Sequence, residues 1–168
     1  QQYDKPLALL HFDAHCDTWP DNGSESLNHG TMFYKAIKEN LINPSISAQV
    51  GIRTWNDDFL GMNIIDAPWV HDQGISTTIK KILEIIGTHP VYLSFDIDCL
   101  DPAFAPGVSH HEPGGFTSRE ILSILQNIQG NVISADLVEF NPSRDASGIT
   151  AMLAGKLFKE LLDVMLRA

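Results

Sequence analysis

Cysteine is scarce in this sequence of 168 residues, which contains only Cys16 and Cys99. Two cysteines are too few for the disulfide framework of a small secreted domain. Acidic residues lie close to both in the sequence, and such neighbours disfavour a reactive thiolate. We therefore expect both thiols to be reduced and the protein to be cytoplasmic.

Basic side chains are also scarce, because 11 Lys and Arg stand against 21 Asp and Glu and leave a formal net charge of −10. Nucleic-acid-binding proteins neutralise phosphates with Lys and Arg, so this balance argues against a nucleic-acid partner. It suits a small cationic ligand, although many acidic proteins have no such ligand.

Long apolar runs are absent, so we expect no transmembrane helix and no membrane partner. Residues 1–6 have neither the basic head nor the apolar stretch of a signal peptide. No Met opens the sequence and a buried-strand pattern begins at Leu7, so we expect a piece truncated at the N-terminus. No repeat or linker divides residues 1–168, which predicts a single α/β domain.

Segments typical of strands alternate with segments typical of helices. The pattern predicts strands at residues 7–12, 48–52, 63–67, 91–97 and 132–140. It predicts helices at residues 31–39, 76–86, 117–126 and 149–166, of which the third begins with a capping box of Thr117 and Glu120. Such alternation implies right-handed crossovers and a parallel sheet with helices on its faces.

Three of the predicted strands run into residues that can bind a metal ion. Ligands of open parallel sheets bind at the carboxyl ends of the strands, and residues two apart on a strand share a face. The residues that can bind a metal ion are Asp13, His15 and Asp17 after the first strand, Asp96 and Asp98 at the fourth, and Asp136 and Glu139 on the fifth. If the first and fourth strands are neighbours, the four Asp carboxylates and the His15 imidazole at their ends converge.

A cluster of four carboxylates and one imidazole cannot stay ionised and buried by itself. Like charges within ~4–6 Å raise one another's pKa, whereas two divalent cations would balance four negative charges. Oxygen-rich ligation with a single imidazole suits Mn²⁺, while zinc would recruit more His or Cys. The alternative is that these acids only cap helices and solvate loops, as single Asp residues often do.

Three motifs in the sequence are HFDAHCD at 11–17, SFDIDCLDPAFAPG at 94–107 and VEFNPSRD at 138–145. With these motifs the sequence resembles the ureohydrolase (arginase/agmatinase) family, and agmatinases most closely. The resemblance implies a three-layer arginase-like α/β fold, with five of the family's eight parallel strands present and helices on both faces. It also implies two Mn²⁺ ions and a homo-oligomer, either a trimer or a hexamer.

The resemblance also implies roles for the individual metal ligands. Asp13 and Asp96 match the carboxylates that bridge both ions. Asp17 matches a ligand of one ion, and His15 and Asp98 match ligands of the other. The family's upstream Gly-Gly-Asp-His segment, whose His completes the first shell, is not among these residues. We therefore expect one incomplete site in this chain alone, and one ion held more tightly than the other.

Two further residues match the family's catalytic groups. Two ions ~3.5–4 Å apart lower the pKa of a shared water from about 15.7 toward about 7, which generates a nucleophile. Glu139 matches the family's guanidinium-binding Glu, although it could instead pair with Arg144 at the surface. His29 matches a His that passes a proton to the leaving amine, a task suited to a pKa of about 6.5. A loop His can also be merely solvated.

The expected substrate depends on the cavity wall. Arginases place Asn where this sequence has Trp19, and that Asn helps to bind the amino-acid carboxylate. Where the family often reads Thr-Gly-Thr-Pro, this sequence has Ser109-His110-His111-Glu112, so we expect His110 and His111 to contact the substrate tail. These features favour a hydrolase that cleaves agmatine to putrescine and urea, with Trp19 and Glu139 among its substrate-binding residues.

Two alternatives remain open at this stage. The substrate could be a guanidino acid such as guanidinobutyrate, whose carboxylate could bind to His110, His111 or Arg53. The chain could also be a metal-binding fragment or a non-catalytic relative with a regulatory role.

Overall fold

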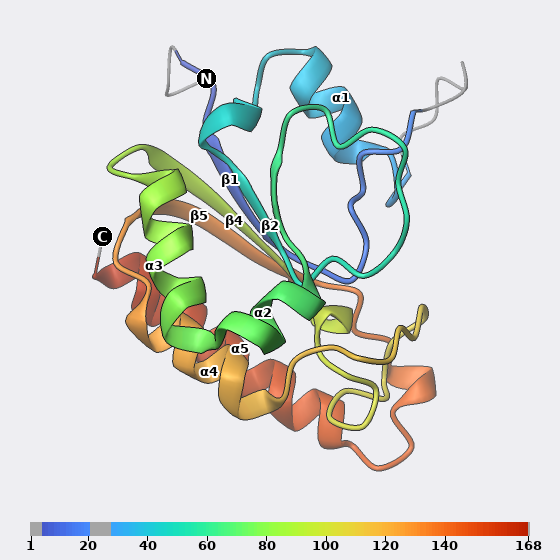
Figure 1. Ribbon diagram of the computed structural model, residues 1–168. Coiled ribbons are helices and arrows are strands. Elements are labelled where there is room, and N and C mark those ends of the chain that lie inside the picture. Colours follow the sequence, from blue (N-terminus) through green and yellow to red (C-terminus); the bar gives the residue numbers. More distant parts are fainter. Residues whose placement is uncertain (1–4, 21–27, 168) are drawn as a thin grey trace.

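The computed structural model describes residues 5–20 and 28–167, which form a single parallel sheet flanked by helices (Figure 1). The strands lie side by side in the order β3-β2-β1-β4-β5, and every pairing is parallel. Their bounds are β1 Ala8–Phe12, β2 Ala48–Val50, β3 Asn63–Ile65, β4 Pro90–Asp96 and β5 Asn131–Val138. All five predicted strands and their parallel arrangement are therefore confirmed.

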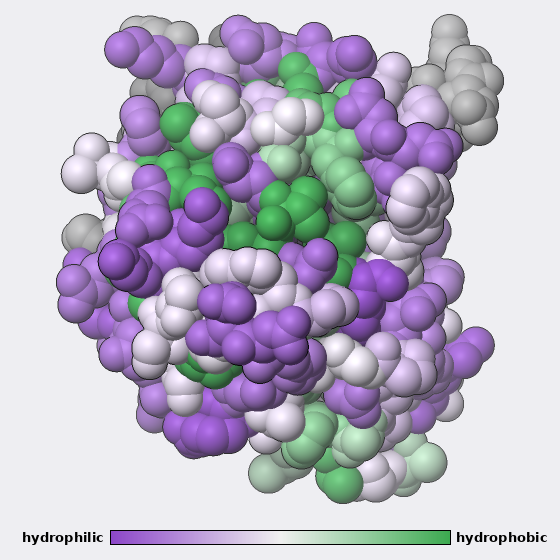
Figure 2. Space-filling view, in the orientation of Figure 1, coloured by the Kyte–Doolittle hydropathy of each residue, from purple (hydrophilic) through white to green (hydrophobic). Residues whose placement is uncertain are grey.

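The helices cover both faces of the sheet, which gives three layers. In Figure 1, α3, α4 and α5 lie next to one another on one face, and α1 lies on the opposite face. The bounds of the helices are α1 Met32–Lys38, α2 Ala67–Gln73, α3 Ile75–Ile86, α4 Ser118–Asn127 and α5 Ile149–Leu166. Within the described part of the chain, no helix is long and apolar enough to cross a bilayer. Hydrophilic residues cover much of the face shown in Figure 2.

The alternation of side chains along β1 determines which face carries the acidic groups. Ala8, Leu10 and Phe12 belong to the larger core beneath α3, α4 and α5. Leu9 belongs to the smaller core beneath α1, and the His11 ring on the same face lies 4.7 Å from the ring of Phe33 in α1. Because successive residues of a strand alternate between the two faces, β1 directs its polar end toward the α1 side.

Local sequence signals explain where the elements begin and end. The predicted capping box is confirmed, since the Thr117 and Glu120 side chains accept each other's backbone N–H groups. The prediction of a strand over residues 63–67 was too long, because β3 ends at Ile65 and α2 begins at once. Asp66 accepts a hydrogen bond from the backbone N–H of Trp69, as an N-cap residue does.

Candidate metal centre and active site

The pairing of β1 with β4 brings two groups of acids together. Phe12 is the register partner of Phe95, so Asp13 and Asp96 follow at the same edge of the sheet. The backbone N–H of Ala14 donates to Asp98 Oδ1 at 3.2 Å, and His15 Nδ1 lies 3.1 Å from Asp98 Oδ2. The convergence expected from neighbouring strand ends is therefore present in the structure.

Asp17 reaches this cluster by a different path from the one that strand alternation predicts. The strand ends at Phe12, and the chain turns, with Asp17 in the left-handed region at φ 51°. The Phe33 amide donates to the Asp17 carbonyl at 3.1 Å and ties this turn to α1. Ligand atoms of His11, Asp13 and Asp17 lie within 4.8 Å of one another, as do those of Asp13, His15 and Asp98. Asp13 is thus common to both sets.

The buried carboxylates repel one another strongly. Burial and the charge of Asp13 raise the pKa of Asp96 to about 11 and the pKa of Asp17 to about 7. Burial by itself would raise the pKa of Asp13, but His11 holds that pKa well below its ordinary value. Burial by itself would lower the pKa of His15, but hydrogen bonds to Asp13 and Asp98 raise it to about 10.

This donor set fits two divalent cations. Four carboxylates and the His15 imidazole provide mainly hard oxygen ligands, and a cation would relieve the repulsion that raises the pKa of Asp96. Asp13 lies where it can serve both ions, since it belongs to both sets of ligand atoms.

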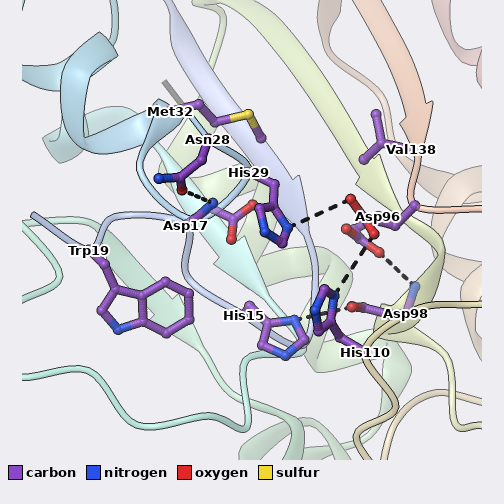
Figure 3. A pocket seen from close by; sticks show the side chains of 12 residues that line it. His15, Asp17, Trp19, Asn28, His29, Met32, Asp96, Asp98, His110 and Val138 are labelled. Atoms are coloured by element: carbon purple, nitrogen blue, oxygen red, sulfur yellow. Dashed lines mark hydrogen bonds and ion pairs between the residues drawn. The ribbon is translucent and has the colours of Figure 1, made fainter. Parts of the chain in front are cut away.

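A cavity of about 410 Å³ opens above the acids, and Figure 3 shows its lining. Asp17, Asp96 and Asp98 line it from the metal-ligand side, whereas His29 and Glu139 line it from other segments. The indole of Trp19 is part of the wall, with its ring centre 6.4 Å from that of His15. The cavity therefore joins the acidic cluster to an aromatic surface.

Glu139 enters the cavity because β5 ends at Val138 and the next residue takes a left-handed conformation, φ 62°. Its Oε1 lies 3.9 Å from His29 Nδ1, and its Oε2 lies 4.0 Å from His110 Nδ1. Among the ion pairs of the described residues, Glu139 has none with Arg144, which was the alternative partner. Left-handed backbone at non-glycine residues is uncommon and concentrates at functional sites.

His111 and Arg53, both considered as partners of the substrate tail, make other contacts in the structure. His111 is exposed against the Pro106 carbonyl, 2.8 Å from its Nε2, and does not line the cavity. Arg53 cannot bind a substrate carboxylate, because backbone carbonyls occupy its guanidinium donors. Those carbonyls belong to Gly51, Asp98, Cys99, Leu100 and Glu112. Arg53 holds the loops around the centre in place instead.

Two buried polar residues beneath the acids, His11 and Gln49, were not among the predicted site residues. The Gln49 side-chain nitrogen lies 3.0 Å from His11 Nδ1 and also donates to the Cys16 carbonyl. Since an amide nitrogen only donates, Nδ1 accepts and the ring proton is assigned to Nε2. That nitrogen is 2.9 Å from Asp13 Oδ2, so the imidazole lies directly against the buried carboxylate. His11 precedes Asp13 by two residues, so the alternation of β1 could have revealed it.

Replacing His11 should weaken metal binding although it is not expected to touch an ion. His11→Leu in the full-length protein removes the imidazole that holds Asp13 in place. The Mn²⁺ affinity should fall about 10–100-fold, as is typical when a residue that contacts a metal ligand is lost. A Mn²⁺ titration of the metal-free protein measures this, with exposed His89→Leu as the matched control. Equal Mn²⁺ affinity in the two variants would show that His11 only fills space.

Comparison with known proteins agrees with this fold. A model of the Arginase family matches residues 1–163. An agmatinase from Chromobacterium violaceum is 57% identical over 166 residues, which are 98% of this chain and 52% of that protein. The chain thus spans about half the length of this curated relative.

Solved structures give the same result. A hypothetical agmatinase from Burkholderia thailandensis matches with a TM-score of 0.94 and 55% identity, over 98% of this chain and 52% of that one. Proclavaminate amidino hydrolase from Streptomyces clavuligerus matches with a TM-score of 0.92 and 40% identity, over 97% and 56% of the two chains. The resemblance seen in the sequence motifs is confirmed, and this chain belongs to the arginase family.

Proposed function

We propose that the whole protein is a dinuclear metal hydrolase that cleaves agmatine to putrescine and urea. The observation that carries this proposal is the convergence of five potential ligands at the ends of β1 and β4, with Glu139 beside the same cavity. The five ligands are Asp13, His15, Asp17, Asp96 and Asp98. The agmatinases among its relatives favour the same activity.

Mn²⁺ is the proposed metal, because the ligands are mostly carboxylate oxygens. Asp13 and Asp96 would bridge the two ions, Asp17 would bind one, and His15 and Asp98 would bind the other. When bound, the two ions supply activation of a water molecule, because they lower its pKa. The protein must then hold the guanidine carbon next to that water.

Glu139 supplies the positioning of the substrate. Its two oxygens can accept two N–H groups of a planar guanidinium, which fixes both distance and orientation. His29, within 3.9 Å of the same carboxylate, is placed to donate a proton to the departing amine. Its side chain is 64% exposed, so it can exchange that proton with solvent.

The wall of the cavity favours a substrate without a carboxylate. None of the described residues that line it is Lys or Arg, and Trp19 offers an apolar surface to an alkyl chain. The engagement of Arg53 with backbone carbonyls removes one of the partners that a guanidino acid could have used. His110 is then the remaining candidate for such a carboxylate.

Agmatine is therefore expected to be hydrolysed with a kcat/KM at least about 100-fold above that for arginine, because a desolvated, unpaired carboxylate costs several kcal/mol. The test is urea release by the full-length protein with Mn²⁺, using agmatine, arginine and guanidinobutyrate. Comparable values for agmatine and arginine would contradict the role given to Trp19. Preference for guanidinobutyrate would contradict agmatine as the substrate and leave His110 as the candidate partner of the carboxylate.

A further inference from the structure

Three side chains form a second cluster at the mouth of the cavity. His29 lies ahead of α1, His110 lies in the loop after β4, and Glu139 follows β5. His29 Nδ1 is 3.9 Å from one Glu139 oxygen, His110 Nδ1 is 4.0 Å from the other, and one ligand atom of each lies within 4.8 Å of the others. The two imidazole rings are 5.2 Å apart, and dashed lines in Figure 3 mark their ion pairs.

We propose that His29, His110 and Glu139 bind a third divalent ion of the zinc type, which blocks the cavity. This site is separate in its ligands from the dinuclear centre of Asp13, Asp96 and their neighbours. Binding of the ion does not depend on the proposed hydrolysis, whereas its effect as an inhibitor rests on that proposed function.

The distances are close to those of a tetrahedral site. Ligands at about 2.0–2.1 Å from Zn²⁺ lie about 3.3 Å from one another, so the 3.9 and 4.0 Å separations must close by several tenths of an ångström. The His29 and His110 side chains are 64% and 52% exposed, so both can rotate without disturbing the packed core. Water can occupy the fourth position.

The donor set selects a different metal from the one proposed for the dinuclear centre. Two imidazoles and one carboxylate suit zinc, whereas four carboxylates with one imidazole suit manganese. Charge also permits a third ion. Two divalent ions balance the four Asp carboxylates. The negative charge of Glu139 is then not neutralised by them and can attract a third cation.

Binding at this cluster competes directly with the substrate. Glu139 is the carboxylate proposed to hold the guanidinium, and it cannot bind a cationic substrate and Zn²⁺ through the same oxygens. Zinc should therefore raise the apparent KM for agmatine and leave kcat unchanged, as a competitive inhibitor does. His29 would be withdrawn from proton transfer in the same complex.

The experiment uses the full-length protein loaded with Mn²⁺ and then equilibrated with increasing Zn²⁺. Elemental analysis after gel filtration is expected to give one Zn²⁺ per chain with the Mn²⁺ content unchanged. Urea release at several agmatine concentrations should show the rise in apparent KM over the same range of Zn²⁺.

Two neighbouring variants identify the ligands. His110→Ala removes one imidazole and is expected to weaken Zn²⁺ binding more than about 10-fold, since even groups that only support a metal ligand contribute that much. His111→Ala is the matched control, because His111 is the next residue and lies outside the cavity. Its Zn²⁺ affinity should equal that of the unmodified protein.

Several results would overturn the proposal. If each Zn²⁺ taken up displaces one Mn²⁺, and His110→Ala and His111→Ala behave alike, zinc binds in the dinuclear centre. An absence of bound zinc, or equal weakening by His110→Ala and His111→Ala, would also reject it. If one Zn²⁺ binds through His110 but no guanidine is hydrolysed, the third site stands and the proposed function fails.

Discussion

Asp13→Asn in the full-length protein is expected to abolish binding of both metal ions, whereas Asp17→Asn should spare one of them. Asp13 belongs to both sets of ligand atoms, while Asp17 belongs to one. Loss of the Asp13 charge therefore weakens two sites. Asp96→Asn should act in the same way, because the resemblance to the family makes Asp96 the second bridging carboxylate. The Mn²⁺ content per chain after dialysis measures the difference.

Asp136→Asn provides a matched control for these variants. Asp136 lies on β5 and accepts hydrogen bonds from the Tyr92 and Ser94 hydroxyls, outside the lining of the cavity. The same loss of charge there should leave both ions bound. Equal loss of Mn²⁺ in the Asp13, Asp17 and Asp96 variants would count against the assignment of bridging positions.

Glu139→Gln should retain both metal ions and lose most of the activity on agmatine. Glutamine keeps the shape of the side chain but removes the charge that opposes the guanidinium. A charge-assisted hydrogen bond contributes about 1.5–3 kcal/mol, so kcat/KM should fall roughly 10- to 100-fold or more. Steady-state kinetics and metal analysis on the same preparation separate the two effects.

Glu84→Gln on α3 is the control for that substitution, because Glu84 is exposed and pairs only weakly with Lys80 at 3.9 Å. Its kcat/KM should match that of the unmodified protein. A fall in Mn²⁺ content for Glu139→Gln would identify Glu139 as a metal ligand and refute its proposed role.

The sequence predicted the sheet well because apolar runs and capping residues act locally. The apolar runs of β1 and β4 are buried on both faces, and acidic residues stand at the end of each run. These acids come together because the two strands are neighbours in the sheet. Among the described residues, α2 is the α-helix that was not predicted; it is short, but Asp66 and Pro68 marked its start in the sequence.

Features that depend on loop paths could not be predicted in this way. Strand alternation placed Asp17 beside Asp13, but β1 ends earlier, and a left-handed turn at Asp17 brings it there. The hydrogen bonds of Arg53 could not be predicted without the path of the loop that contains Glu112. Five carbonyls from separate positions accept hydrogen bonds from this one guanidinium. The identity of the metal and the oligomeric state remain predictions.

The two buried thiols provide a means to follow opening of the metal centre. Cys16 and Cys99 are both fully buried within its loops, and burial together with the charge of Asp96 raises the pKa of the Cys99 thiol well above its usual value. An alkylating reagent can therefore reach them only when this region opens locally. Because metal bound to the closed form lowers the open population by a factor of 1 + [M]/Kd, the labelling rate reports metal affinity without any enzymatic turnover.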